Sequence, residues 1–332
     1  MKIEVQFSNN IIIIHDNKKV IECMINKSYE RSFKAKKDYK ISLKSLTYSK
    51  VPYLYLMPAI IIFSVIIIFP IFQAFYISLF RYDGIRSMVF IYFQNYSNIL
   101  KDAKFYNALK NTGIFMLLNV IIQNSIAIPL AVILNSKILM SKFFKSLYFI
   151  PSILSVVVIG FIFQFIFNPV FGVLNEFLRQ IGLSVFALNW LGDTRIALFS
   201  VIFVTCWQGI GYGTVIYLGG LQSISADIYE AAEIDGSHGV NTFLKITFPL
   251  LAPVFTVSII VSTITNIREF GRIFVMTKGG PAGATDVIVT YLFRNFESGY
   301  LGYGSAVSVL LFIIIVTISF FQIKILSKRE NY

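Results

Sequence analysis

Long apolar runs alternate with short polar connections along most of this 332-residue chain. Six runs are long enough to cross the hydrocarbon core of a bilayer, which needs about 20 residues of helix. They cover Tyr53 to Phe80, Thr112 to Leu134, Ser146 to Phe167, Ile196 to Leu221, Ile246 to Ile267 and Ser305 to Ile323. The pattern predicts an all-α, polytopic membrane protein with six transmembrane helices.

Prolines fall inside or beside several of these runs. Transmembrane helices tolerate proline because neighbouring groups can satisfy the backbone carbonyls that it leaves unpaired. We therefore expect kinks or entry turns, and not breaks, at Pro58, Pro70, Pro129, Pro249 and Pro253.

The composition agrees with a lipid environment. The chain is 56% hydrophobic and 14% charged, and its mean hydropathy is +0.72. A soluble domain of this length could not bury so much apolar surface, so lipid must solvate it.

A polar stretch between the fourth and fifth runs departs from the apolar pattern. Asp227 can cap a helix there, Glu230 can complete a capping box, and Gly236 can supply the left-handed residue that ends the helix. These residues predict a rigid helix of about two turns.

The predicted short helix is suited to docking. Small Ala231 and Ala232 allow close approach, and Glu230, Glu233 and Asp235 offer charge. The alternative is an amphipathic linker that covers lipid headgroups, but such a helix is expected to carry Lys and Arg where this one carries acids.

The same stretch resembles the cytoplasmic EAA loop of ATP-binding-cassette importer permeases, through Glu230-Ala231-Ala232, Asp235-Gly236, Ile246, Pro249 and Pro253. More narrowly, the chain is similar to the maltose-type sugar permease family from Tyr53 to about Ile325. Further matching segments are Tyr53–Pro58, Phe69–Pro70, Phe149–Pro151, Gly219–Ile224, Thr277–Pro281 and Gly302–Ala306. Each segment is weak alone, but their order and spacing along one chain are specific.

This resemblance implies the type I importer permease fold over residues 51–332, with a coupling loop at about 222–245. It implies that Glu230, Ala231, Ala232, Asp235 and Gly236 contact an ATPase. The implied partners are a second permease subunit, an ATPase dimer that holds ATP and magnesium, and an extracellular solute-binding protein. The expected solute is a sugar or oligosaccharide, and a glycerol phosphodiester or similar polyol derivative stays open.

Basic residues predict the orientation. With both termini inside, 18 Lys and Arg residues fall on the inner side and 11 on the outer side. The positive-inside rule therefore favours both termini, and the Glu230 loop, in the cytoplasm. We interpret the net charge of +12 as a topology signal and not as a nucleic-acid footprint.

Residues 1–50 differ from the rest, because they are rich in Lys and hold one short apolar run, Ile11 to Ile14. That run is too short for a signal-peptide core or a span, so no cleaved leader is expected. We expect a basic cytoplasmic tail. It could form a strand-rich appendage or a juxtamembrane segment on anionic lipid, or the true start could lie downstream, with Met24 a candidate.

Residues for catalysis are sparse. Cys23 and Cys206 are predicted in different parts of the fold, and His15 and His238 have no partners at ligand spacing. The chain has no Gly-x-x-x-x-Gly-Lys-Ser/Thr loop. We expect no metal, cofactor or catalytic site here, so another subunit must bind any ATP.

Polar residues inside the spans are the remaining candidates, because a polar group that faces lipid is costly. Ser262, Asn266 and Glu269 recur at helical spacing, and amide, carboxylate and aromatic side chains suit sugar hydroxyls and rings. The resemblance implies a solute path at Ser152, Thr205, Gln208, Gly209, Ser262, Asn266 and Glu269. The alternatives are interhelical hydrogen bonding and, for Glu269, an ion pair with Arg268.

Two other classes of membrane protein fit this sequence less well. A secondary transporter or channel would explain six spans, but it is expected to carry coupling or selectivity charges within them and has no need of the Glu230 helix. A membrane enzyme would need His, Asp or Glu clustered at one face. The sequence favours the permease subunit of an ATP-driven importer that alternates between outward-open and inward-open states.

Overall fold

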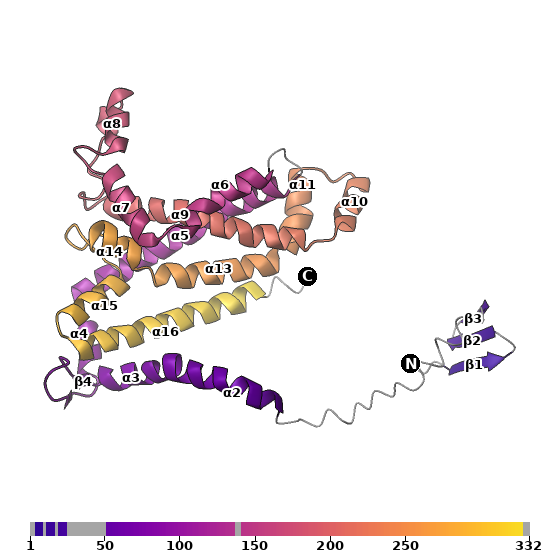
Figure 1. Cartoon of the computed structure of the whole chain (residues 1–332), viewed down its shortest axis with the longest axis horizontal. Coiled ribbons are helices and arrows are strands. Elements are labelled where there is room, and N and C mark those ends of the chain that lie inside the picture. Colours follow the sequence, from indigo (N-terminus) through magenta and orange to yellow (C-terminus); the bar gives the residue numbers. More distant parts are fainter. Residues whose placement is uncertain (1–3, 9–10, 17–18, 25–50, 137–140, 328–332) are drawn as a thin grey trace. The chain divides into compact units, whose positions relative to one another are not determined.

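The computed structural model describes residues 4–8, 11–16, 19–24, 51–136 and 141–327. The chain divides into two compact units, residues 1–66 and 67–332, which are described separately (Figure 1).

The first unit contains a three-stranded antiparallel sheet in the order β1-β2-β3. Its strands are β1 (Glu4–Ser8), β2 (Ile11–Asp16) and β3 (Lys19–Met24). These strands agree with the strand-rich interpretation of the tail, whereas the basic stretch up to Lys50 lies largely outside the described residues. The helix α2 (Val51–Phe63) follows.

Among its described residues, the second unit has helices and one two-stranded hairpin, β4 (Phe80–Arg81) with β5 (Val89–Phe90). Its first half contains α3 (Phe69–Ser78), α4 (Gln94–Ile99), α5 (Ala103–Asn135), α6 (Ser141–Ile153), α7 (Val156–Ile166), α8 (Val173–Gln180) and α9 (Ala197–Gln222). Its second half contains α10 (Ala226–Ile234), α11 (Val240–Thr242), α12 (Phe248–Leu250), α13 (Ala252–Ile267), α14 (Gly271–Thr277), α15 (Ile288–Glu297) and α16 (Leu301–Leu326). Short π and 3-10 segments are η1 (Ser64–Ile68), η2 (Ser184–Phe186) and η3 (Phe243–Thr247).

Four helices in the described part of the chain are long and apolar enough to cross a membrane: Tyr55–Ser78, Ala103–Asn135, Ala197–Gln222 and Leu301–Leu326. They confirm the first, second, fourth and sixth predicted spans. Two further apolar stretches are bent pairs of helices, so the number of spans is six if each pair is counted as one.

The bends lie at the third and fifth predicted spans. The pair Phe143–Ile153 and Val156–Ile166 is bent by 93°, and the pair Val240–Leu250 and Ala252–Ile267 by 69°. The third and fifth predicted spans are therefore each a pair of helices joined by a bend and not one straight helix. Pro151 lies within α6 just before the first bend, where it lacks the N–H that would continue the helix ladder.

Three of the other prolines lie in the predicted entry turns, although Pro249 and Pro253 also flank the 69° bend. Pro70, Pro249 and Pro253 stand in the first turns of α3, α12 and α13, where a missing N–H costs nothing. Pro129 lies inside α5 without interrupting it, and Pro58 lies inside α2.

The core of the second unit follows α5 along its whole length. Near the start of α5, Phe105 and Ala108 pack with residues of α15 and α16. In the middle of α5, Phe115 packs with α7, α9 and α14. Near the end of α5, Ala127 and Ala131 pack with α9. Figure 1 shows α10 and α11 at the opposite end of this unit from α4 and α15. The buried core of this unit thus consists of three clusters arranged along α5.

Candidate functional site

The polar helix predicted between the fourth and fifth runs is α10 (Ala226–Ile234). Its N-cap is Ser225, whose side chain accepts a hydrogen bond from the Asp227 backbone N–H at 3.4 Å. The predicted cap at Asp227 and its capping box with Glu230 are therefore wrong. Asp227 instead lies in the first turn, where a carboxylate interacts favourably with the helix dipole.

The predicted end of α10 is confirmed. Gly236 has a φ of +75°, its N–H donates to the Glu233 carbonyl at 3.0 Å, and the Ser237 N–H donates to the Ala232 carbonyl at 2.9 Å. This pair of bonds is the Schellman arrangement, which satisfies the last carbonyls of a helix and favours Gly at the left-handed position. The chain therefore leaves α10 in a defined direction.

Most of the proposed coupling residues lie at the surface. Glu230, Ala231, Asp235 and Gly236 are exposed, whereas Ala232 is 5% exposed and belongs to the packed side of the helix. Sequence reasoning missed Ile234, whose side chain is 88% exposed. This exposed surface of α10, with acidic and apolar side chains side by side, could receive a partner.

The proposed path residues gather partly around the bend between α6 and α7. The Gln208 side chain on α9 donates to the Leu154 carbonyl at 2.9 Å, and the Ser152 hydroxyl donates to the Gln208 backbone carbonyl at 2.8 Å. Gln208 is 3% exposed. It thus satisfies a carbonyl that the broken helix leaves free, as an interrupted membrane helix requires.

Gln208 also connects to charged residues beyond α13. Its Oε1 accepts a hydrogen bond from Arg272 Nε at 2.9 Å, and Arg272 pairs with Glu269. Glu269 Oε1 in addition accepts from the Arg272 backbone N–H at 3.0 Å. Glu269 is 8% exposed, so the pair lies among packed side chains. We call Gln208, Glu269 and Arg272 the buried polar triad.

The expected shared helical face of Glu269 and the alternative of an ion pair with Arg268 are both wrong. It does not share a helical face with Ser262 and Asn266, because α13 ends at Ile267. Its ion-pair partner is Arg272 and not Arg268, which is exposed. Arg272 stands three residues after Glu269, a spacing at which oppositely charged side chains commonly meet, and that spacing was available in the sequence.

The remaining path candidates do not contact the triad through hydrogen bonds. Asn266 donates to the Ser262 carbonyl of its own helix at 2.8 Å. The Thr205 hydroxyl bonds within α9, and its carbonyl accepts from the Gln123 side chain at 3.2 Å. A Cβ at Gly209 would lie 2.6 Å from Gln123 Nε2, so that glycine leaves room for the Gln123 amide against α9.

A further polar cluster between α5, α9 and α13 was missed by sequence reasoning. Asn124 Oδ1 accepts hydrogen bonds from the Tyr217 hydroxyl at 2.6 Å and from the Ser258 hydroxyl at 3.1 Å. Asn119 Oδ1 accepts from the Cys206 thiol at 3.2 Å. These contacts join neighbouring helices, which is the interhelical role that polar side chains often have in membranes.

Comparison with known proteins gives a family match over residues 123–332, to the family described as binding-protein-dependent transport system inner membrane component. Three curated relatives match at 32–34% identity over 82–85% of the chain and 94–96% of their own length. They are the probable ABC transporter permease protein YurN of Bacillus subtilis (34%), the trehalose/maltose transport system permease protein MalF of Thermococcus litoralis (32%) and the sn-glycerol-3-phosphate transport system permease protein UgpA of Agrobacterium fabrum (33%).

Solved structures share the fold. A chain of a bacterial ABC transporter for import of the acidic polysaccharide alginate matches with a TM-score of 0.74 and 21% identity, covering 86% of this chain and 98% of that one. A chain of a bacterial alginate ABC transporter in complex with an alginate pentasaccharide-bound periplasmic protein matches equally well, over 87% of this chain.

Proposed function

This chain belongs to the family of binding-protein-dependent transport system inner membrane components and is a multi-pass permease subunit of an ABC importer; from this premise we propose that its solute is a neutral sugar or oligosaccharide. The observation that carries the proposal is the buried polar triad beside the bend between α6 and α7. Discontinuous membrane helices commonly contribute to solute sites because they free backbone groups at membrane depth.

The charge of the triad favours a neutral solute over a phosphate ester. Arg272 is the triad's cation, and its charge is compensated by Glu269. A phosphate would need uncompensated cations or several N–H donors. The amide of Gln208, in contrast, can exchange its bonds for those of solute hydroxyls when the helices move.

We propose further that α10 docks into an ATPase at the cytoplasmic side. Support comes from the exposed Glu230, Asp235 and Ile234 and from the fixed turn at Gly236. The proposed partners are a dimer of ATPase subunits that hold ATP and magnesium, a second permease subunit and an extracellular solute-binding protein. The proposed orientation has both termini in the cytoplasm.

The docking proposal can be tested with Gly236→Val. Valine would meet a left-handed conformation at a cost of about 1–2 kcal/mol, and it would project beside the docking surface. We expect the purified complex to lose ATPase subunit or to lose solute-stimulated ATP hydrolysis, while the helices remain inserted. Glu230→Lys, which reverses an exposed charge on α10, is expected to act in the same direction.

Gly182→Val is the matched control. Gly182 has a φ of +81° and, like Gly236, has open space around the position of a Cβ, but it follows α8 in a different connection. It carries a similar backbone cost and should leave ATPase retention and stimulation unchanged. Normal stimulation and uptake in both Gly236→Val and Glu230→Lys would contradict docking through α10.

A further inference from the structure

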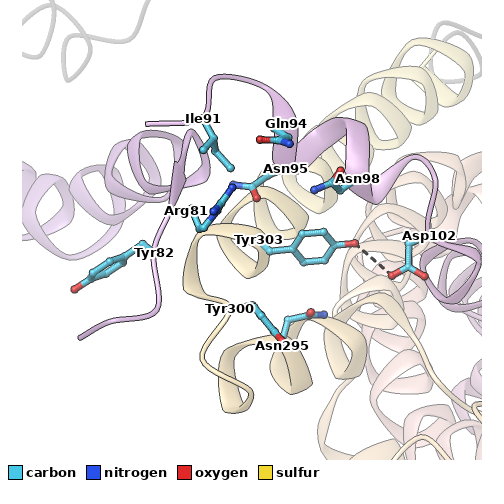
Figure 2. A pocket seen from close by; sticks show the side chains of 10 residues that line it. All are labelled: Arg81, Tyr82, Ile91, Gln94, Asn95, Asn98, Asp102, Asn295, Tyr300 and Tyr303. Carbon is cyan, nitrogen blue, oxygen red and sulfur yellow. Dashed lines mark hydrogen bonds between the residues drawn. The ribbon is translucent and has the colours of Figure 1, made fainter. Parts of the chain in front are cut away.

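A half-open cavity of about 460 Å³ lies at the end of the second unit opposite α10. Its walls come from β4, α4, α15, α16 and the residue before α5 (Figure 2). Cavities that bind small molecules commonly have volumes of about 300–1,000 Å³. The cavity shares no residue with the buried polar triad.

One wall of the cavity is held rigid by Asp102. Its Oδ1 caps α5 by accepting from the Lys104 N–H at 2.8 Å, and its Oδ2 accepts from the hydroxyls of Tyr291 at 2.6 Å and Tyr303 at 3.3 Å. Figure 2 shows the Tyr303 ring reaching across toward Asp102. Asp102 thereby joins α5, α15 and α16 at this wall of the cavity.

The Asp102 carboxylate is ionised at neutral pH. Partial burial raises its pKa, but the hydrogen bonds from Tyr291, from the Lys104 backbone and from Tyr303 outweigh burial and leave the pKa below its usual value. The Arg81 guanidinium lines the same cavity, so the two charges balance. A strongly anionic or cationic ligand would gain little from this arrangement.

Carboxamide groups supply the hydrogen-bonding capacity of the cavity. Gln94 and Asn98 lie four residues apart on α4, and neither side chain forms a hydrogen bond within the described residues. Asn95 donates to the carbonyls of Ser78 and Phe80, and Asn295 donates to the Tyr291 carbonyl, which leaves their Oδ1 atoms as acceptors. Figure 2 places the α4 amides on one side of Tyr303 and Asn295 with Tyr300 on the other.

Hydroxyl groups both donate and accept hydrogen bonds, and a carboxamide can pair with either, because its NH₂ donates and its C=O accepts. Tyrosine rings add an apolar surface with a polar edge. We propose that this cavity is a second binding site for a neutral, hydroxyl-rich solute of the size of one or two saccharide rings. The inference rests on the proposed function, because it assigns the same class of solute to the outer end of the permease.

The test is direct binding to the assembled transporter without its solute-binding protein. The probes are maltose and trehalose, with glycerol 3-phosphate as the anionic comparison. Binding of each probe is measured by saturation-transfer NMR. We expect maltose or trehalose to bind the wild type, and the double variant Asn98→Leu with Asn295→Leu to bind about 10-fold or more weakly, since two hydrogen bonds are lost. Asn241→Leu, at an exposed position of α11, is the matched control and should bind normally.

A path variant separates this inference from the proposed function. Gln208→Leu alters the buried triad and should leave saccharide binding at the cavity unchanged. The inference is overturned if neither saccharide binds the wild type, or if the double variant binds a saccharide as well as the wild type does. Either result would leave the proposed docking of α10 untouched. Binding of glycerol 3-phosphate with no saccharide binding would overturn the inference and the proposed solute class together.

Discussion

The buried polar triad places a charged pair among apolar helices, and Gln208 makes that arrangement tolerable. Burying an ion pair costs several kcal/mol per ion in desolvation unless further hydrogen bonds satisfy both groups. Gln208 supplies such a bond to Arg272 while its amide N–H caps the freed Leu154 carbonyl. Asn266 differs, because the hydrogen bond of its side chain goes to the preceding turn of its own helix.

Because of this difference, we expect the two variants to differ in stability, although both residues are proposed for the solute path. Gln208→Leu would leave Arg272 Nε and the Leu154 carbonyl unpaired, so we expect it to lower the free energy of unfolding by about 1–3 kcal/mol. Asn266→Leu should leave the thermal unfolding midpoint nearly unchanged yet weaken the apparent affinity for solute about 5-fold to 150-fold. Unfolding of the purified protein and uptake by cells provide the two readouts. Unchanged solute dependence in Asn266→Leu would remove that residue from the path.

The first turn of α16 packs against the strand β4 at contact distance. A Cβ at Gly302 would lie 2.0 Å from the Phe80 carbonyl oxygen, and the Gly302 N–H donates to the Tyr82 carbonyl at 3.1 Å. Gly304 faces the Phe296 ring, where a Cβ would lie 2.5 Å from Cε1. The Gly302–Ala306 segment thus permits an approach that side chains would prevent, and it supports one wall of the outer cavity.

Alanine at Gly302 should therefore separate α16 from β4. Overpacking of this kind typically costs about 1–3 kcal/mol, which we expect as a lower thermal unfolding midpoint. Gly113→Ala is the matched control, because Gly113 lies inside α5 with open space around the Cβ position. It should raise stability by up to about 1 kcal/mol through helix propensity. An equal midpoint for both variants would contradict the close approach.

The second unit presents two different ends, an exposed acidic and apolar helix at α10 and a polar cavity near α4 and α15. An importer needs that asymmetry, because ATP is hydrolysed on one side of the membrane and solute arrives on the other. The long helices α5, α9 and α16 cross between these ends. The proposed orientation assigns the α10 end to the cytoplasm.

Cysteine labelling tests this orientation. In a Cys23→Ser, Cys206→Ser background, we expect an impermeant thiol reagent added to intact cells to label Ile85→Cys. Ile234→Cys should stay unlabelled until the membrane is permeabilised and the docked ATPase subunits are removed. Both positions are well exposed, at 94% and 88%. Labelling of Ile234→Cys in intact cells would reverse the orientation and remove α10 as a cytoplasmic docking helix.

Local pattern was enough to predict the long helices, the short α10 and the left-handed Gly236. Apolar runs longer than the bilayer is thick have few alternatives to a membrane helix, and Gly at a helix end is favoured by backbone geometry that involves only near neighbours. The family resemblance rested on the same short segments, and the family match agrees with it.

Contacts between distant segments could not be predicted in this way. At the 93° bend after Pro151, the freed Leu154 carbonyl accepts a hydrogen bond from Gln208 of another helix, and Gln208 also accepts one from Arg272, 64 residues further along the chain. The outer cavity joins β4 and α4 to α15 and α16, which lie about 200 residues further along the chain and share no motif with them. A sequence pattern encodes the periodicity of one helix, whereas a bend, a buried ion pair or a cavity depends on which side chains other helices bring alongside.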